Sequence, residues 1–470
     1  MVNIILDREE DSIGDLLASS NSLDIYAKIF SHGKTHKPIM IALYVDDSIY
    51  IFSRIINHVR VLKDILEGLS NKNLHVYDLK YFCTAYASLG ISFEYANIAR
   101  IHDARVNLAR FYGHSSALDT PHVFIIGDKN MELKKAKLLM SKSGSEGFHP
   151  QIIPESDLIK LAVADLSNLH RSRISFETHL SSCRFEDVMI ASQIAYSNIE
   201  YVGMQLDPNH IYDIGDKTVR KHFFDYSHGD TIGYPCYHFD RTNTGRLTSG
   251  FHSMKKDHRV MVTPRIGCQI VELDFTCFEP KVLFNMFGIA EPAADIYTAV
   301  MNNVPHITKR EDAKQAILAT IYGSSADEET SKALERRYGL MTKLAEWKEE
   351  NLKDGVVSVT KYGKKLIFEN NDELKRIGLN AHIQSDGAVI MLDFIARLVF
   401  AMKRRLHRCE VVATIVDAVY INAPKAEVIT LAEHLIPSTI RNTPSMKSEY
   451  IQYTCKILAG KNMRDMSNVN

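Results

Sequence analysis

Two apolar runs in the sequence end in an aspartate. "QIVELD" ends at Asp274 and "VVATIVD" ends at Asp417. Both are rich in β-branched and aliphatic residues, so they predict two buried strands with a carboxylate at each tip. An aspartate that closes a strand is by itself most often a turn residue. Two such carboxylates on neighbouring strands can instead hold divalent cations, because Mg²⁺ prefers oxygen ligands.

The composition is that of an ordinary globular protein. The chain has 470 residues, 45% hydrophobic and 24% charged, with a formal net charge of -1, and this length predicts about two or three domains. Its 7 cysteines include no C-x-x-C pair, which argues against a disulfide framework or a zinc module and favours a reducing compartment. The acidic amino terminus lacks the basic region of a signal peptide, and no apolar run reaches the roughly 20 residues of a membrane-spanning helix. We therefore expect a cytoplasmic protein without membrane contact.

The order of apolar patterns predicts two domains of mixed α/β and α+β type. Strand-like runs such as "PIMIALYVDD" alternate with helical spacing before residue 150, and 154–202 is helical by spacing. Further on, we expect a helix near 309–322, one long charged helix near 327–354, a helix near 372–406 and a hairpin at 410–423. The expected domains are 1–175, a connecting segment at 176–240, and 241–470.

Arg310 and Lys314 lie four residues apart in "KREDAKQAILATIYGSS", hence on one face of the expected helix. Two cations on one helical face can bind a triphosphate. An isolated pair of this kind is more commonly a solvated charged face, so its meaning depends on the motifs around it.

Six motifs in a fixed order together resemble the family A DNA polymerases, the group of bacterial DNA polymerase I and many phage replicases. "TGRLTS" contains Arg246 and is similar to T-G-R-L-S, and "DFTCFEPK", from Asp274 to Lys281, is similar to D-Y-S-Q-I-E-L-R. The helix with Arg310 and Lys314 resembles R-x-x-x-K-x-x-x-[FY]-G-x-x-Y-G.

The three remaining motifs follow downstream, so that the resemblance covers roughly residues 240 to 425. "VTKYGKKL" resembles T-x-x-G-R-R, and "IVDA", with Asp417, resembles V-H-D-E. "RIGLNAHIQSDGAVIMLDFIARL" resembles R-x-x-x-N-x-x-x-Q-G-x-A-A-D and aligns Arg376, Asn380 and Gln384.

The resemblance implies a right-hand polymerase palm and fingers, with template-directed addition of deoxynucleotides to a primer 3′ end. It implies that Asp274 and Asp417, with the main-chain carbonyl of Phe275, hold two Mg²⁺ ions. The implied nucleotide-binding residues are Arg310, Lys314, Leu318, Tyr322 and Glu279. The implied primer and template contacts are Arg246, Lys281, Arg376, Asn380 and Gln384. Glu279 falls where the family excludes a ribose 2′-hydroxyl, which implies deoxynucleotide (dNTP) substrates.

Several positions depart from the family pattern. Leu318 replaces the aromatic residue that stacks on the incoming base, and Lys281 replaces an arginine. Val416 and Ala418 replace the His and Glu beside the second aspartate. Fewer than 40 residues separate Asp207 from Gly245, which predicts a reduced thumb and a role for a processivity or replisome partner.

The amino-terminal part resembles the family's RNase H-like 3′–5′ exonuclease domain in degenerate form. Asp24 and Asp165 align with two of its metal-binding acids, whereas Tyr26 and Phe82 stand where acids are expected. A two-metal nuclease needs several carboxylates, so we expect no proofreading.

Two alternatives to a DNA polymerase remain open on the sequence. One is a polymerase-derived nucleic-acid-binding protein without catalysis, and the other is a single-subunit RNA polymerase. The compact form favours a phage or mobile-element protein acting in the cytoplasm of a bacterial host.

Overall fold

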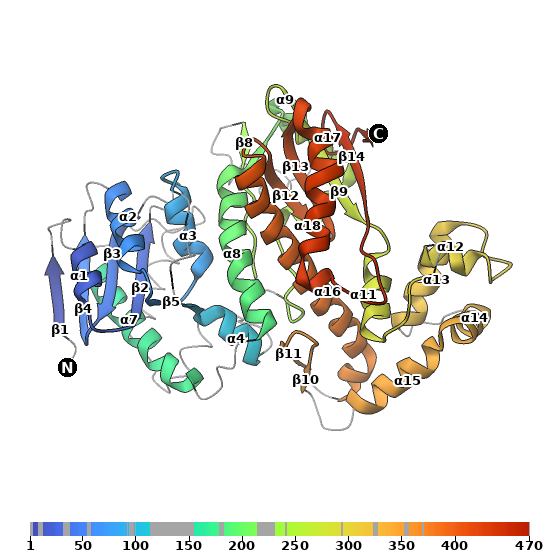
Figure 1. Ribbon diagram of the computed structural model, residues 1–470, viewed down its shortest axis with the longest axis horizontal. Coiled ribbons are helices and arrows are strands. Elements are labelled where there is room, and N and C mark those ends of the chain that lie inside the picture. Colours follow the sequence, from blue (N-terminus) through green and yellow to red (C-terminus); the bar gives the residue numbers. More distant parts are fainter. Residues whose placement is uncertain are drawn as a thin grey trace. The chain divides into compact units, whose positions relative to one another are not determined.

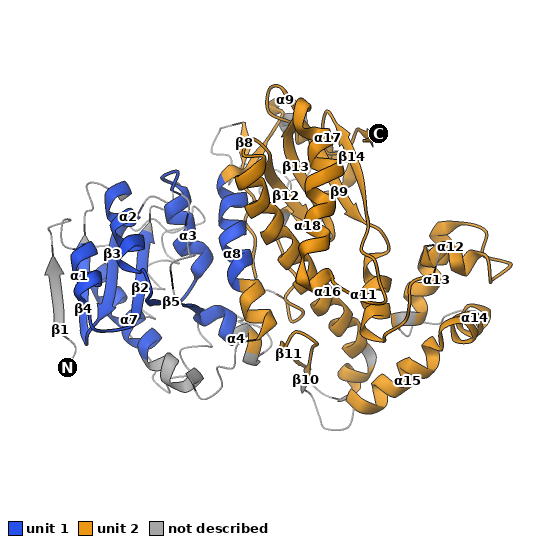
Figure 2. Ribbon diagram, viewed as in Figure 1, with its two compact units in different colours: residues 1–108, 115–182, 190–201 blue, residues 109–114, 183–189, 202–470 orange. Residues whose placement is uncertain are grey.

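The computed structural model of the chain divides into two compact units. Residues 1–108, 115–182 and 190–201 form the first unit, and residues 109–114, 183–189 and 202–470 form the second (Figure 2). The structure (Figure 1) describes residues 3–7, 13–31, 38–53, 58–91, 93, 98, 100–112, 155–177, 183–213, 231–239, 242–292, 295–322, 328–351, 357–368 and 371–469.

The first unit is built on a six-stranded mixed sheet with the order β1-β4-β3-β2-β5-β6. Strands β2, β3 and β4 form an antiparallel meander, whereas β1, β5 and β6 join parallel to their neighbours. The strands are β1 Asn3–Asp7, β2 Asp24–Ser31, β3 Pro38–Val45, β4 Ser48–Ser53, β5 Asn73–Val76 and β6 Arg100–Asp103.

Helix α7, Glu155–Glu177, packs against β2, β3 and β4 of this sheet. Its buried residues Leu158, Leu161, Ala162 and Leu166 follow helical spacing and join the core formed with Tyr26 and other strand residues. The other helices assigned wholly or partly to this unit are α1 Ile13–Ser19, α2 His58–Gly68, α3 Leu79–Ala87, α4 Ala104–Tyr112 and α8 Arg184–Val202. The expected mixed α/β content is confirmed.

The second unit is built on a five-stranded antiparallel sheet with the order β12-β13-β9-β14-β15. Its strands are β9 Cys268–Phe275, β12 Glu410–Ile415, β13 Ala418–Pro424, β14 Cys455–Gly460 and β15 Met466–Asn468. The two strands expected to end in aspartates are therefore β9 and β12, and β13 pairs with both of them. This arrangement brings Asp274 and Asp417 to the same end of the sheet.

Helix α16, Asn371–Arg405, is the longest helix in the described ranges at 35 residues, and α11, α13 and α18 pack against it. Acidic residues in its first turn and Lys403, Arg404 and Arg405 in its last turn complement the helix dipole. The other helices of the second unit are α9 Pro208–Asp213, α11 Phe278–Met286, α12 Ile296–Met301, α13 Arg310–Tyr322, α14 Glu328–Tyr338, α15 Leu340–Asn351, α17 Val428–Thr430 and α18 Ile436–Asn442.

Short elements complete the second unit. The two-stranded pairs are β7 Met204–Gln205 with β8 Ile232–Gly233, and β10 Val357–Val359 with β11 Lys365–Ile367. The 3₁₀ turns are Gly250–Ser253, Lys256–Met261, Lys425–Glu427 and Pro444–Met446, and Leu431–Leu435 is a π-helix.

The expected helices near 309–322 and 372–406 are confirmed as α13 and α16, but the single helix expected near 327–354 is wrong. Gly339 separates α14 from α15 with a φ of +59°, a left-handed conformation that ends a helix and that glycine adopts without strain. Residues 214–230, in the segment where a reduced thumb is expected, lie outside the described ranges, so that expectation stays a prediction. No helix in the described ranges is long and apolar enough to cross a membrane.

Candidate active site

Asp274 and Asp417 lie at adjoining positions at one end of the five-stranded sheet. Asp274 is near the end of β9, where it is directly opposite Ala418, the first residue of β13. Asp417 is in the two-residue turn that joins β12 to β13, and the backbone N–H of Phe275 donates to its carbonyl oxygen at 3.5 Å. The backbone register therefore fixes the two carboxylates beside one another.

Burial and neighbouring charges shift the pKa of both carboxylates. Partial burial and the negative charges of Asp417 and Glu272 raise the pKa of Asp274 to about 6. Burial, together with the charge of Glu279, also raises the pKa of Asp417. The charge of the Lys314 ammonium group acts in the opposite direction and lowers the pKa of both aspartates.

This donor set fits a hard divalent cation. The site offers two carboxylates at one end of the sheet, and oxygen ligands of this kind suit Mg²⁺. Like charges held together raise a carboxylate pKa, and a bound cation relieves that repulsion. In the part of the chain that the structure describes, no three histidine, cysteine or acidic side chains are arranged to hold a metal ion.

Val416, which precedes Asp417, has a φ of +56° and a half-exposed side chain. A positive φ at the first position of a two-residue hairpin turn is normally met by glycine, and it is strained for a β-branched residue. Such strain persists where the surrounding structure enforces it, and it is frequent at functional sites. The strained turn orients the Asp417 backbone next to β9.

Glu279, in the first turn of α11, has a partner on each carboxylate oxygen. Arg246 Nη2 donates to Oε1 at 3.1 Å, and the Tyr322 hydroxyl donates to Oε2 at 2.6 Å. The three residues come from a loop, from α11 and from the end of α13. The structure thus brings together three residues that the sequence had singled out in three separate motifs.

Arg310, Lys314, Leu318 and Tyr322 succeed one another at four-residue intervals along α13 and share one face of it. Lys314 is exposed and its charge acts on both aspartates, and Leu318 is partly buried. This face of α13 therefore carries two cations, an aliphatic side chain and a tyrosine, and the tyrosine at its end contacts Glu279.

Arg310 has three neighbours that sequence reasoning missed. Its guanidinium is 3.6 Å from Asp295 Oδ1, donates to Cys277 Sγ at 3.5 Å, and lies over the Tyr297 ring at 4.8 Å. Asp295 also caps α12 by accepting from the backbone N–H of Tyr297 and Thr298. An aspartate just before "IYTAV" was a visible helix-cap signal, but nothing in the sequence indicated its ion pair with Arg310.

The residues expected to contact primer and template differ in their placement. The Asn380 and Gln384 side chains are hydrogen-bonded to each other at 2.7 Å on α16. Arg376 is one turn earlier on the same helix, and its side chain lies outside the described residues.

Lys281 does not fit its expected role. It is only 3% exposed, its ammonium is 2.9 Å from Glu291 Oε1, and it donates to the carbonyl of Gln452 at 2.7 Å and to Thr454 Oγ1 at 3.1 Å. These contacts tie α11 to the segment that leads into β14. The expectation that Lys281 contacts the nucleic acid is therefore replaced by an internal structural role.

In the first unit, Asp24 and Asp165 are each held by protein partners. Asp24 Oδ1 accepts from Asn73 at 2.9 Å and lies 2.9 Å from His75 Nε2. Asp165 pairs with Lys28 at 2.9 Å, and although burial lowers the Lys28 pKa, the Asp165 charge outweighs it and raises that pKa overall.

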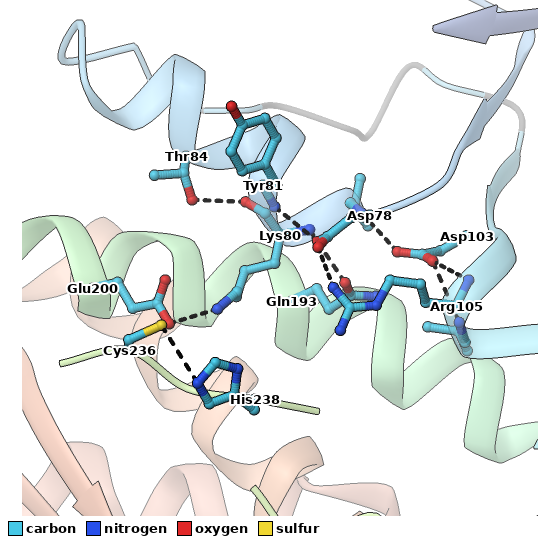
Figure 3. Close-up of polar contacts among 12 residues, drawn as sticks. Asp78, Lys80, Tyr81, Thr84, Asp103, Arg105, Gln193, Glu200, Cys236 and His238 are labelled. Atoms are coloured by element: carbon cyan, nitrogen blue, oxygen red, sulfur yellow. Dashed lines mark hydrogen bonds and ion pairs between the residues drawn. The ribbon is translucent and has the colours of Figure 1, made fainter. Parts of the chain in front are cut away.

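Figure 3 shows two further acids of this unit, Asp78 and Asp103, together with Arg105. Neither acid was predicted from the sequence to be a site residue. Asp78 caps α3 and pairs with Arg105; burial alone would raise its pKa, but Arg105 and then Lys80 hold it below the ordinary value. Burial and the neighbouring charge of Asp78 raise the pKa of Asp103 to about 7. Both acids are thus engaged in internal contacts.

No protein-family model and no curated protein sequence matches the chain. Asp274 and Asp417 lie at one end of an antiparallel sheet, and the chain as a whole has the fold of a DNA polymerase domain. Among solved structures it is similar to the POL domain of Pol1 from M. smegmatis in complex with DNA primer-template and dNTP. The TM-score is 0.76 at 11% identity, over 98% of this chain and 99% of that chain. The expected resemblance to the family A polymerases is confirmed at the level of the fold.

Proposed function

We propose that the protein is a template-directed DNA polymerase of family A type that adds deoxynucleotides to a primer 3′ end. The observation that carries this proposal is that the register of β9, β12 and β13 brings Asp274 and Asp417 to one end of the sheet, where the charge of Lys314 acts on both. The similar structure of the Pol1 POL domain, which holds primer-template and dNTP, supports it.

Asp274 and Asp417, with the carbonyl of Phe275, would bind two Mg²⁺ ions, which supply activation of the primer hydroxyl and stabilisation of the leaving pyrophosphate. Lys314, whose charge acts on both carboxylates, would bind the triphosphate of the incoming nucleotide. Arg310, one turn away on the same helix face, would bind it as well. Two fixed cations at this place stabilise negative charge that develops on the leaving group.

Glu279 would set the choice of sugar. Arg246 and Tyr322 fix both of its carboxylate oxygens, so the side chain cannot turn away easily. A fixed side chain beside the sugar disfavours an additional 2′-hydroxyl, which favours deoxynucleotides over ribonucleotides. Leu318, on the same face of α13, would contact the base through an aliphatic surface in place of a flat ring.

Asn380, Gln384 and Arg376 on α16, with Arg246, would contact primer and template. Amide and guanidinium groups suit contacts to the backbone and minor groove that do not depend on sequence. We propose that residues 1–175 form a degenerate exonuclease-like domain. The partners of Asp24 and Asp165 support this, because each carboxylate is already bound by protein side chains. We infer a polymerase without proofreading that acts in the cytoplasm of a bacterial host, with a processivity or replisome partner.

Primer extension on a DNA template with Mg²⁺ tests the proposal directly. The wild-type protein should extend the primer, and Asp274→Asn and Asp417→Asn should each reduce the rate by several orders of magnitude while primer-template binding is retained. The matched control is Glu349→Gln, an exposed carboxylate on α15 that should leave extension unchanged.

The outcomes separate the alternatives. Primer-template binding without extension under any divalent metal would favour the non-catalytic binding protein. Equal use of ribonucleotides and deoxynucleotides would favour the RNA polymerase. Extension that persists in both aspartate variants would mean that a contaminating enzyme is responsible.

A further inference from the structure

Glu272 lies on the same face of β9 as Asp274, because residues two apart in a strand point to the same side. Its carboxylate is held from β13, since the Tyr420 hydroxyl donates to Glu272 Oε1 at 2.6 Å. Arg259 Nη1 donates in turn to the Tyr420 hydroxyl at 3.1 Å. An arginine, a tyrosine and a glutamate thus form a chain of hydrogen bonds that ends beside Asp274.

The sheet register explains why Glu272 is placed to act on this site. Ala418 is opposite Asp274, and Tyr420 is opposite Glu272. Ala418 has no polar group, although the motif that its segment resembles has an acid at this position. The sheet nevertheless has an acid near this position, because Glu272 lies on β9 two register positions further from the end of the sheet.

The Glu272 side chain projects from the same side of the sheet as that of Asp274, two residues away along β9. Glu272 Oε2 makes no hydrogen bond to any residue within the described ranges, so the carboxylate is held at one oxygen only. Glu272 is not one of three acids arranged around a common metal position in the described part of the chain. It would consequently act through Asp274 and not as a ligand.

We propose that Glu272, fixed by Tyr420 and Arg259, is a positioning residue of the candidate metal centre that strengthens divalent-cation binding at Asp274 and Asp417. This inference rests on the metal site in the proposed function. A negative charge within several ångströms of a divalent cation contributes attraction that partly solvated protein does not fully screen. Its removal should therefore weaken cation binding without removing a ligand.

Binding of Mn²⁺ alone, without nucleotide or DNA, provides a readout independent of turnover. Electron paramagnetic resonance titration of free Mn²⁺ should give a Kd for Glu272→Gln that is about three- to tenfold higher than that of the wild type. Glu433→Gln makes the same change of charge at an exposed acid of the π-helix Leu431–Leu435 and should leave the Kd unchanged. Asp274→Asn defines the background binding of other sites.

Tyr420→Phe keeps the Glu272 charge but releases its oxygen, and it serves as the second variant if Glu272→Gln does not fold. It should raise the Mn²⁺ Kd by about twofold or more. Wild-type Mn²⁺ affinity in a folded Glu272→Gln protein, or in Tyr420→Phe when that is the only folded variant, overturns the inference.

The same variants separate this inference from the proposed function. If the wild type extends primers, Glu272→Gln should need more Mg²⁺ for half-maximal rate and approach the wild-type rate at saturating Mg²⁺. If the wild type extends no primer but Glu272→Gln still weakens Mn²⁺ binding, the polymerase proposal fails and the positioning role stands. Loss of extension with unchanged Mn²⁺ affinity would contradict the positioning role alone.

Discussion

The Tyr322 hydroxyl, at the end of α13, donates a 2.6 Å hydrogen bond to Oε2 of Glu279 in the first turn of α11. The helix that carries the two cations is thereby joined to the helix that follows the first aspartate. Burial and the neighbouring Glu279 charge raise the Tyr322 pKa, so the tyrosine remains protonated and able to donate. The contact makes the position of Glu279 dependent on α13.

Sugar discrimination should fall when Glu279 is shortened. For Glu279→Ala, we expect the ratio of kcat/KM for deoxynucleotides over ribonucleotides to drop by roughly 10-fold or more, because loss of steric exclusion is worth that order of magnitude. Tyr322→Phe removes only the hydrogen bond and should lower the ratio less. Single-nucleotide incorporation with matched dNTP and rNTP measures it, and an unchanged ratio in Glu279→Ala would assign sugar choice to another residue.

Nucleotide affinity should depend on the geometry of Arg310 as well as its charge. Arg310→Lys keeps the charge but loses the planar donor group, and it should raise the dNTP KM by roughly 10-fold with a smaller change in kcat. Steady-state extension over a range of dNTP concentrations measures both constants.

Asp295→Asn should change the dNTP KM in the direction opposite to Arg310→Lys. It removes the carboxylate that pairs with Arg310 at 3.6 Å, while an asparagine can still cap α12. With that negative charge gone, the dNTP KM should fall severalfold. A rise in KM would mean that Asp295 chiefly orients Arg310, and that its repulsion of the triphosphate is secondary.

Lys281 should matter for stability. Lys281→Met leaves Glu291 without its cation and removes the bonds to Gln452 and Thr454, so the free energy of unfolding should fall by about 3 kcal/mol. Denaturant unfolding measures this change. The double variant Lys281→Met/Glu291→Gln should recover part of the loss, and wild-type stability in the single variant would contradict the assigned role.

A buried carboxylate on α16 should make stability depend on pH. Asp386 is 2% exposed, its Oδ1 has no hydrogen-bond partner within the described ranges, and burial raises its pKa to about 7. A folded-state pKa above the unfolded value of 3.8 means that this contribution to stability is fully present below pH 4 and is lost as pH rises through 7.

Asp386→Asn should abolish that dependence. Relative to the wild type, its free energy of unfolding should rise between pH 4 and pH 8 by up to about 4 kcal/mol, from the size of the pKa shift. Unfolding by denaturant at several pH values measures the difference. Glu349→Gln, an exposed change on α15, should run parallel to the wild type, and a parallel curve for Asp386→Asn would show that this carboxylate is charged in the folded protein.

The main features of the candidate site were predictable from the sequence because they depend on local pattern. Apolar runs that end in Asp274 and Asp417 predict strand tips, and four-residue spacing places Arg310 and Lys314 on one helix face. Helix α16 was predictable for the same reason. What spacing cannot supply is the partner of a side chain across the fold.

Three misses have that origin. The burial of Lys281 depends on residues 452–454, which are about 170 positions away in sequence and follow no motif. The ion pair of Arg310 with Asp295 and the chain from Arg259 to Glu272 also join separate elements. The break at Gly339 was a local signal that the charged pattern on either side concealed.

Strand β9 is hydrogen-bonded along both edges, to β13 on one side and to β14 on the other. Amide hydrogens at its centre can exchange with solvent only when the sheet itself opens, so they should be among the slowest in the second unit. The backbone hydrogen bonds of α13 lie within the helix itself, so we expect α13 to open at a lower free-energy cost than the central strand of the sheet. Heating should therefore release the α13 cations from the site while the strand carrying Asp274 is still folded, and nucleotide binding would be lost at a lower temperature than the sheet.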